Sequence, residues 1–254
     1  MTVEKKDQIR ALLKSIETGD PEPVAVVNEA KYIQHNPGTH EGSEGLAALF
    51  QRLSKTSPHV NIVRAFEDGD FVFAHTEYDF ASRKIGFEIF RFEDGRAVEH
   101  WDNIQERLGP NAAGRSMVDG PTDAVDLELT EQSRALVRSF VETVLIDGQL
   151  DRLTHFIDER SFAEHNPRLP GDIPALRSLF EFGVGDARPV DYQQLHRVLA
   201  ERNFVLSVSE GRIDGAHCAF FDLFRIADNK IVEHWDTTER IAPQSEWKNS
   251  NGKF

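Results

Sequence analysis

The sequence contains little that would cross-link the chain or anchor it in a membrane. Cys218 is the single cysteine among 254 residues, which excludes a disulfide within the chain and a cysteine-based zinc site. No apolar run approaches the roughly 18 residues that cross a bilayer, and residues 1–7 open a charged helix rather than a secretory signal peptide. We therefore expect a cytoplasmic protein with no membrane partner.

Positive charge is also scarce. Lys and Arg number 29 against 43 Asp and Glu, which gives a formal charge of -14, and no long basic run is present. Nucleic acids and anionic lipids are themselves negative, so both are poor candidates for partners. A hydrophobic content of 39% with 28% charged residues is typical of a globular protein.

A repeat dominates what the sequence does contain. Val98–Asp102 reads Val-Glu-His-Trp-Asp and returns unchanged as Val232–Asp236. Tyr32–Pro37 and Phe162–Pro167 both end in His-Asn-Pro, at an offset of about 130 residues. A repeat of this length in a chain of this size indicates two domains. Gly and Pro gather between the copies, so we predict a first domain at 1–109, a linker at 110–128 and a second domain at 129–254.

Both halves show the same order of elements. In the first half, apolar residues at helical spacing predict three helices, at 9–16, 24–30 and 46–53. Beyond Pro58, alternating apolar residues and Gly-containing turns predict four strands, at 60–66, 71–80, 85–92 and 97–105. The fold class is therefore α+β, with three N-terminal helices packed on a curved antiparallel sheet in each half.

The register of the last hairpin decides which side chains share a face. If Asp94 and Gly95 form a two-residue turn, Glu88 pairs with Trp101; if a three-residue loop begins at Glu93, Glu88 pairs with His100. We favour the second register, because Gly95 and its counterpart Asn229 both tolerate the left-handed conformation. One face then carries Glu88, Phe90, Val98, His100 and Asp102, and the matching face carries Asp222, Phe224, Val232, His234 and Asp236.

These features together resemble a known family. Three helices, a His-Asn-Pro turn, a long bent sheet and a terminal Gly-x-x-Val-Glu-His-Trp-Asp strand are similar to the SnoaL-like polyketide cyclases. That family lies within the cone-shaped superfamily of ketosteroid isomerase and nuclear transport factor 2. The resemblance covers about 100 residues of each half and implies two tandem cone-shaped α+β barrel domains, each with one pocket. Fold alone does not fix function in this superfamily, which includes isomerases, cyclases, hydrolases and binding modules.

The resemblance also implies where a site would lie. In ketosteroid isomerases an acid on the strand that matches Glu88 helps bind the developing oxyanion, and the base lies beside a Pro in the turn that matches His35. In SnoaL-like cyclases the acid/base is an Asp on the closing strands, for which Asp102 and Asp236 are the nearest candidates. The catalytic candidates are thus His35, Glu88, His100, Asp102, His165, Asp222, His234 and Asp236. The candidates for substrate binding are His75, Phe90, Phe92 and Phe224.

Such residues suit proton abstraction next to a carbonyl, followed by isomerisation, aldol cyclisation or elimination in an apolar pocket. We expect a small hydrophobic carbonyl-containing ligand and no cofactor. The sequence lacks the helix 1 Tyr of the isomerases, which weakens the case for that reaction itself. A metal site from His35, His75 and His100 is disfavoured, because Val208 replaces His75 in the second half and no ligand motif is present.

Structural explanations of the same residues stay open. His35 and His165 could tie down the loop before Pro, and His100 and His234 could be hydrogen-bonded core residues. The alternative function is then a non-catalytic binding protein for a small ligand. Apolar residues on the opposite face predict that the halves pack sheet against sheet as an internal pseudo-dimer, with a further homodimer left open. These residues are Phe87, Ile89, Trp101, Phe221, Leu223 and Trp235.

Overall fold

The computed structural model describes residues 4–169, 173–181 and 189–254. Contacts divide the chain into two compact units, one of residues 1–107 with 241–254 and the other of residues 108–240. This division differs from the predicted boundaries in one respect. The residues from 108 onward, which follow the last strand of the first unit, belong to the second unit. Residues 241–254, which follow the last strand of the second unit, belong to the first.

Two α-helices and a short 3-10 helix form the helical layer in the described part of the first unit. Helix α1 (Lys5–Thr18) ends at Gly19, whose φ of 72° is the left-handed cap that glycine adopts without strain. Helix α2 spans Gly42–Ser54. The second helix predicted at 24–30 is a 3-10 turn at Glu22–Val26. It stops early because the Asn28 side chain accepts the Ala30 N–H and so makes a competing turn.

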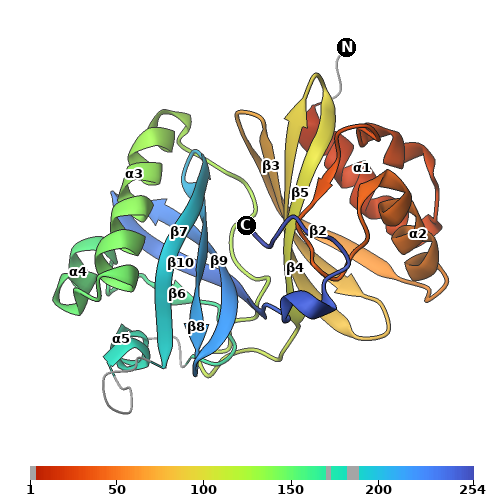
Figure 1. The fold of residues 1–254 in the computed structure, drawn as a ribbon. Helices are drawn as coiled ribbons and strands as arrows, with labels where there is room; N and C mark the ends of the chain where they lie inside the picture. Colours follow the sequence, from red (N-terminus) through yellow and green to blue (C-terminus); the bar gives the residue numbers. More distant parts are fainter. Residues whose placement is uncertain (1–3, 170–172, 182–188) are drawn as a thin grey trace. The chain divides into compact units, whose positions relative to one another are not determined.

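The sheet of the first unit has five strands in the order β1-β5-β4-β3-β2 (Figure 1). Strand β1 runs parallel to β5 and the other neighbours are antiparallel. The strands are β1 (Ile33–Gln34), β2 (His59–Asp68), β3 (Phe71–Asp79), β4 (Arg83–Glu93) and β5 (Arg96–Glu106). The long antiparallel strands agree with the alternation of apolar residues from which they were predicted.

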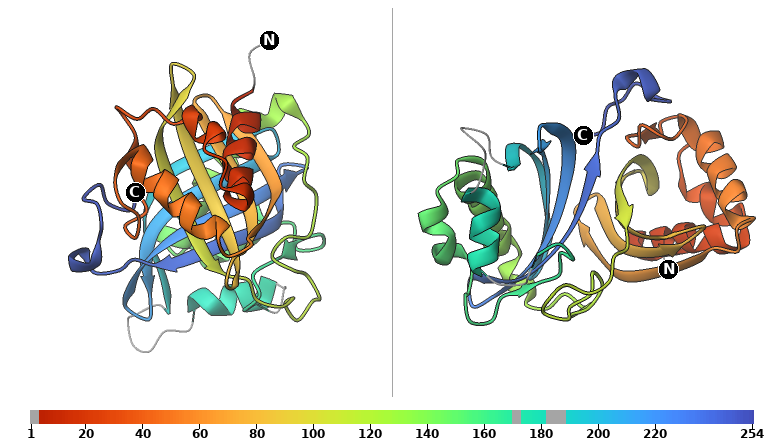
Figure 2. Two further views of the ribbon diagram at one scale, coloured as in Figure 1. Left: turned by 90° about the vertical axis from the view of Figure 1, so that its right-hand side faces the viewer. Right: turned by 90° about the horizontal axis from the view of Figure 1, so that it is seen from below.

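The second unit repeats this topology, with strand order β6-β10-β9-β8-β7. Its strands are β6 (Ala163–Glu164), β7 (Val190–Glu201), β8 (Phe204–Ile213), β9 (Ala216–Ala227) and β10 (Lys230–Arg240). Its α-helices are α3 (Thr130–Phe140), which continues as a π-helical turn at Val141–Ile146, α4 (Leu153–Phe156) and α5 (Ile173–Glu181). Figure 2 shows that the strands of both units bend strongly. The predicted α+β architecture is therefore present twice.

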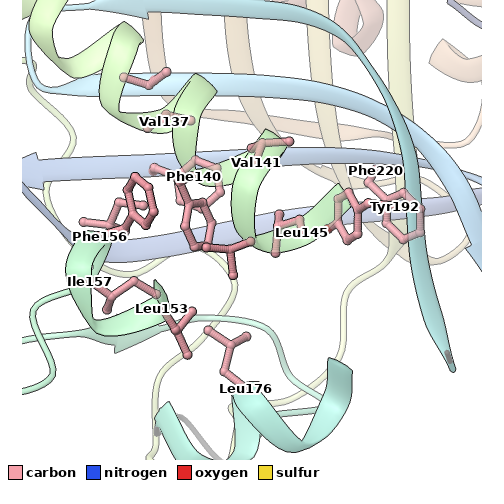
Figure 3. Close-up of a cluster of buried hydrophobic side chains, with 14 of the residues drawn as sticks. Val137, Phe140, Val141, Leu145, Leu153, Phe156, Ile157, Leu176, Tyr192 and Phe220 are labelled. Carbon is pink, nitrogen blue, oxygen red and sulfur yellow. The ribbon is translucent and has the colours of Figure 1, made fainter. Parts of the chain in front are cut away.

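A helical layer against one face of the sheet makes the core of each unit. In the second unit, Phe140 on α3 packs edge-on against Phe156 of α4 and Phe224 of β9, with ring centroids 5.7 and 5.6 Å apart. Figure 3 shows Phe140, Phe156 and Leu153 converging in this layer. Among the residues that the structure describes, no helix is long and apolar enough to cross a membrane.

The closing hairpins correct the predicted register. Asp94 and Gly95 form a two-residue turn with φ of 51° and 77°, and Glu88 lies opposite Asp102. Both registers considered from the sequence are therefore wrong, because a β-bulge follows Arg91 on β4 and adds one residue on β5. The extra residue brings Glu88, Phe90, His100 and Asp102 to one face, as predicted. Val98 and Val232 were wrongly placed on that face, because Ala97 and Ile231 join the helix-side cores in their stead.

The same hairpin geometry occurs in the second unit. Asp228 and Asn229 make the turn with φ of 49° and 57°, the register shifts between Ile231 and Glu233, and Asp222 lies opposite Asp236. The bulge is therefore a shared feature of both copies and not a local irregularity.

The segment after each closing strand contacts a His-Asn-Pro turn. Residues 241–254 belong to the first unit, where Asn251 donates to the Gln34 carbonyl and Asn249 donates to the Asn36 carbonyl. In the second unit, Asn111 donates to the Glu164 carbonyl at 2.7 Å. The two turns are thus covered by equivalent extensions.

Candidate functional site

The first unit contains an apolar hollow between its helices and the inner face of its sheet, with about 450 Å³ of space not filled by atoms. Its apolar walls include Leu13, Ile16, Leu46, Leu49, Phe50, Leu53, Phe80, Phe90 and Ile104. The polar groups that line it are Gln34, Thr39, Tyr78, Glu88, His100 and Asp102. Apolar walls with a few convergent polar groups are typical of a site for a small organic ligand.

Glu88 and His100 form the centre of the polar cluster. Glu88 accepts a hydrogen bond from the Tyr78 hydroxyl at 2.7 Å, and its other oxygen lies 2.8 Å from Nε2 of His100. Nδ1 of His100 lies 3.1 Å from Oε1 of Gln34. That oxygen also accepts the Asn36 N–H at 2.9 Å, so Nδ1 must be the donor and Nε2 shares a proton with Glu88.

Asp102 extends this cluster toward the His-Asn-Pro turn. It is 5% exposed, and Oδ2 accepts the side-chain N–H of Asn36 at 2.7 Å. Oδ1 accepts no hydrogen bond from the described residues and lies 3.6 Å from the ammonium of Lys253. One carboxylate oxygen at the cavity wall is therefore held by charge rather than by a hydrogen bond.

Two adjoining hollows occupy the equivalent place in the second unit, with about 310 and 740 Å³ of unfilled space. They share an apolar wall of Leu176 and Phe180 and a polar wall of Tyr192, Asp222 and His234. The smaller is also lined by Phe140, Leu145, Ile157, Phe162 and Phe224. The larger reaches Asn166, Arg168 and Asp236.

The polar cluster of the second unit follows the same plan with one change. The Tyr192 hydroxyl donates to Asp222 at 3.1 Å, and Nε2 of His234 lies 3.1 Å from the same carboxylate. Nδ1 of His234 faces Glu164, with both carboxylate oxygens at 2.9 Å. Asn166 donates to Asp236 at 2.8 Å. Glu164 thus stands where the first unit has the neutral Gln34.

This change alters the protonation of the second cluster. Burial alone would lower the pKa of His234, but the carboxylates of Glu164 and Asp222 outweigh it and raise the pKa well above its usual value. Burial also raises the pKa of Asp236 to about 7; the positive charge of His234 opposes the rise, and Glu164 and Asp222 add to it. Burial, followed by the charge of Asp222, raises the pKa of Tyr192 well above its usual value.

His35 and His165 lie away from these clusters. His35 donates from Nε2 to Glu99 at 2.9 Å and from Nδ1 to the Gly252 carbonyl at 3.1 Å, and its ring stacks on Trp101. These contacts join the turn to the side of β5 that faces away from Asp102.

His165 makes the equivalent contacts in the second unit. It bonds to Glu233 at 2.9 Å and to the Ser116 carbonyl at 2.7 Å, and it stacks on Trp235. The structural explanation offered for the two turn histidines therefore accounts for their positions, and their predicted catalytic role finds no support in this geometry.

The predicted substrate-binding residues separate into two groups. Phe90 and Phe224 line the cavities. Phe92 is buried in the apolar core of the first unit and is not part of the cavity lining. His75 alternates to the opposite face of β3, where its ring packs against Phe87 at 4.7 Å and Arg64 bonds to Nδ1 at 2.7 Å. The prediction that His75 lines the pocket is wrong, because an odd residue of β3 cannot face the same side as Tyr78.

Sequence reasoning missed four members of the clusters, namely Gln34, Glu164, Tyr78 and Tyr192. Gln34 and Glu164 immediately precede the His-Asn-Pro motif in both copies, so the repeat itself contained their signal. The tyrosines had no such signal, because Tyr78 lies on β3 whereas Tyr192 lies on β7, the counterpart of β2. Two tyrosines from non-equivalent strands therefore hold equivalent acids.

A metal centre was also considered. Ligand atoms of Glu88, His100 and Asp102 lie within 4.8 Å of one another. Both oxygens of Glu88 and both ring nitrogens of His100 already have partners within the protein, and Asp102 lies next to the ammonium of Lys253. An ion would have to replace these contacts, so we treat the group as a hydrogen-bonded acid–base cluster.

Comparison with known proteins agrees with the resemblance in the sequence. Residues 9–100 match the family model described as a SnoaL-like domain. Similar solved structures include TsrD from Streptomyces laurentii, at 22% identity over 41% of this chain and 92% of that chain, with a TM-score of 0.35. An epoxide hydrolase of the LEH-like type from M. tuberculosis is 20% identical over 39% of this chain and 80% of that chain, with a TM-score of 0.34. No curated protein matches the chain.

Proposed function

We propose that the protein is a small-molecule enzyme of the SnoaL-like type, which moves a proton next to a carbonyl group of a hydrophobic ligand. The observation that carries this proposal is a buried carboxylate–imidazole–carboxylate cluster at the wall of an apolar cavity, built in both units. In the first unit its members are Glu88, His100 and Asp102, which are 3%, 5% and 5% exposed. Buried titratable groups that converge on a cavity are typical of acid–base sites.

The chemistry assigned to the cluster is a proton transfer. Asp102 or Asp236 in its ionised form takes the proton from the carbon beside the carbonyl, and the C–H electron pair forms an enolate. The same carboxylic acid then returns the proton to another position, or the enolate closes onto a second carbonyl or expels a leaving group. Tyr78 and His100, or Tyr192 and His234, line the cavities beside the acid. One of their hydrogen bonds within the cluster would have to be exchanged for a bond to the developing oxyanion.

Proton exchange into deuterated solvent tests this proposal. Polyketide-like and steroid-like ketones would be incubated with the wild type, Asp102→Asn, Asp236→Asn and the double variant. A catalytic role predicts a fall in exchange of about 10²- to 10⁴-fold when both aspartates are replaced, with unchanged circular dichroism. Asp119→Asn is a matched control, because Asp119 is outside both cavity linings.

The alternative is a non-catalytic binding protein that uses the same cavities. The saturation of Glu88 by Tyr78 and His100 favours it, since a carboxylate with two fixed partners can simply orient a ligand. Ligand binding without any exchange, or exchange that survives in the double aspartate variant, would make this alternative the better account.

A further inference from the structure

The two clusters differ at one pair of nearly isosteric residues. Gln34 pairs with His100 across the parallel strands β1 and β5, and Glu164 pairs with His234 across β6 and β10. Both side chains are 1% exposed, and both accept the N–H of the Asn two residues later, at 2.9 and 2.8 Å. The geometry is conserved between the units, and the charge is not.

The charge of this residue decides the protonation state of the neighbouring imidazole. His100 lies between the amide of Gln34 and the carboxylate of Glu88, whereas His234 lies between two carboxylates, at 2.9 Å from Glu164 and 3.1 Å from Asp222. Two buried anions on opposite sides of one ring favour the imidazolium. The other groups that face this cluster are Tyr192, Asn166, Asp236 and Arg168.

The extension beside the last acid of each cluster, Asp102 or Asp236, also differs between the two units. Asp102 has the ammonium of Lys253 at 3.6 Å. Lys253 follows Gly252, whose carbonyl binds His35; in the second unit the carbonyl of Ser116 binds His165, and the next residue is Met117. The equivalent position in the second extension is therefore apolar.

We infer that Glu164 is a positioning residue that keeps His234 doubly protonated at neutral pH, so that the second cavity holds a cationic imidazole that can supply a proton during the reaction, whereas the first cavity has the neutral Gln34 at this position. The chain then holds two related sites that differ in charge, one with Gln34 and Lys253 and the other with Glu164 and Met117. The ligand class of the second cavity is a neutral molecule with a basic oxygen, such as a ketone or an ether. The catalytic consequence rests on the proposed function, whereas the protonation states do not.

Reciprocal substitution tests the inference in the full chain. Glu164→Gln and Gln34→Glu exchange the two residues with little change of shape, and NMR of ¹⁵N-labelled histidine reports the protonation of His100 and His234 without any substrate. Glu164→Gln should lower the pH at which His234 loses its proton by about one unit or more, and Gln34→Glu should move His100 the other way. Glu246→Gln, on an exposed 3-10 turn, is the control.

The outcomes separate the inference from the proposed function. If His234 titrates at the same pH in Glu164→Gln and wild type, with both proteins folded by circular dichroism, the positioning role is wrong even if ketone exchange is observed. If His234 responds as expected but no ketone exchanges, the positioning role holds and the proposed enzyme activity fails. Lys253→Met with Met117→Lys extends the test, because it should raise proton uptake at Asp102 and reduce it at Asp236.

Discussion

Asp236 is a partly buried carboxyl group close to other acids, and this environment makes the stability of the second unit depend on pH. Its pKa of about 7 in the folded protein exceeds the value of about 4 in an unfolded chain. The folded state therefore binds more protons between these values, and stability falls as the pH rises through this window. His234 acts in the same direction, because its raised pKa gives stability that is present below about 6.5 and lost as the pH rises through the folded value.

We expect the free energy of unfolding of the second unit to fall by up to about 1.4 kcal/mol per pH unit between about 4 and 7. Asp236→Asn should flatten this part of the profile, because the amide does not titrate. Urea unfolding at several pH values, followed by tryptophan fluorescence, measures the slope. A slope that is the same in Asp236→Asn and wild type would contradict the assignment.

His35 leads to the opposite expectation, a loss of stability without a loss of chemistry. His35→Ala removes hydrogen bonds to Glu99 and to the Gly252 carbonyl and the stacking on Trp101. We expect a loss of about 2 to 4 kcal/mol in the stability of the first unit. Ketone exchange per folded molecule should change little, as measured beside Asp102→Asn. A large fall in exchange with unchanged unfolding would restore the catalytic role of His35.

At the scale of residues, the period-two pattern foresaw that His100 and Asp102 share a face, because that depends only on strand parity. Whether Glu88 joins them depends on the hairpin register, and the bulge gives the same face as the register that the sequence favoured. It could not separate His35 from them. The partner of His35 on its Nδ1 side is Gly252, more than 200 residues away in sequence, and no local pattern indicates such a contact.

At the scale of elements, the hairpins show which features of a sheet are set by the local sequence and which by tertiary contacts. Asp94-Gly95 forms a two-residue turn with positive φ at both positions, as this residue pair favours locally, and the prediction of a three-residue loop was wrong here. The bulge after Arg91 depends on tertiary context, because Ala97 bridges to Val27 and Glu99 pairs with Ile33 on either side of it. Its presence could not be inferred from the hairpin alone.

A glycine controls how the tyrosine of the first cluster reaches its acid. A Cβ at Gly86 would lie 2.7 Å from the Tyr78 ring and 2.9 Å from the Glu88 carboxylate. We expect Gly86→Ala to displace Tyr78 and to destabilise the first unit by about 1 to 3 kcal/mol. Thermal unfolding measures the effect, and Gly109→Ala, which meets no atom within 4 Å, is the control. Equal melting temperatures for both variants would show that the two strands accommodate the added methyl group without loss of stability.

At the scale of the whole molecule, Lys253 shows what the C-terminal segment contributes. It is 3% exposed and lies 3.6 Å from Asp102, so Lys253→Met leaves a buried carboxylate without its cation. Removal of one partner of a buried ion pair typically costs about 3 to 5 kcal/mol. We expect the transition of the first unit to move to lower temperature in calorimetry, with Lys253→Arg retaining most of the stability. An unchanged thermogram for Lys253→Met would exclude this contribution.

The position of the predicted linker and the packing of the same segment depend on different information. Residues 110–128, which are rich in Gly and Pro, contain no regular strand, because turn residues act locally. Where such a stretch packs depends on distant partners, such as the Glu164 carbonyl that Asn111 contacts, and composition does not encode them.

The exchange of extensions has a consequence for cutting the chain into fragments. Each unit is completed by residues that follow the closing strand of the other, 108–121 in one case and 241–254 in the other. A fragment that ends near residue 110 therefore lacks its own final layer, whereas a cut at Thr122, in an exposed stretch, gives two pieces that each carry the missing part of the other. We expect such pieces to complement one another as split proteins do.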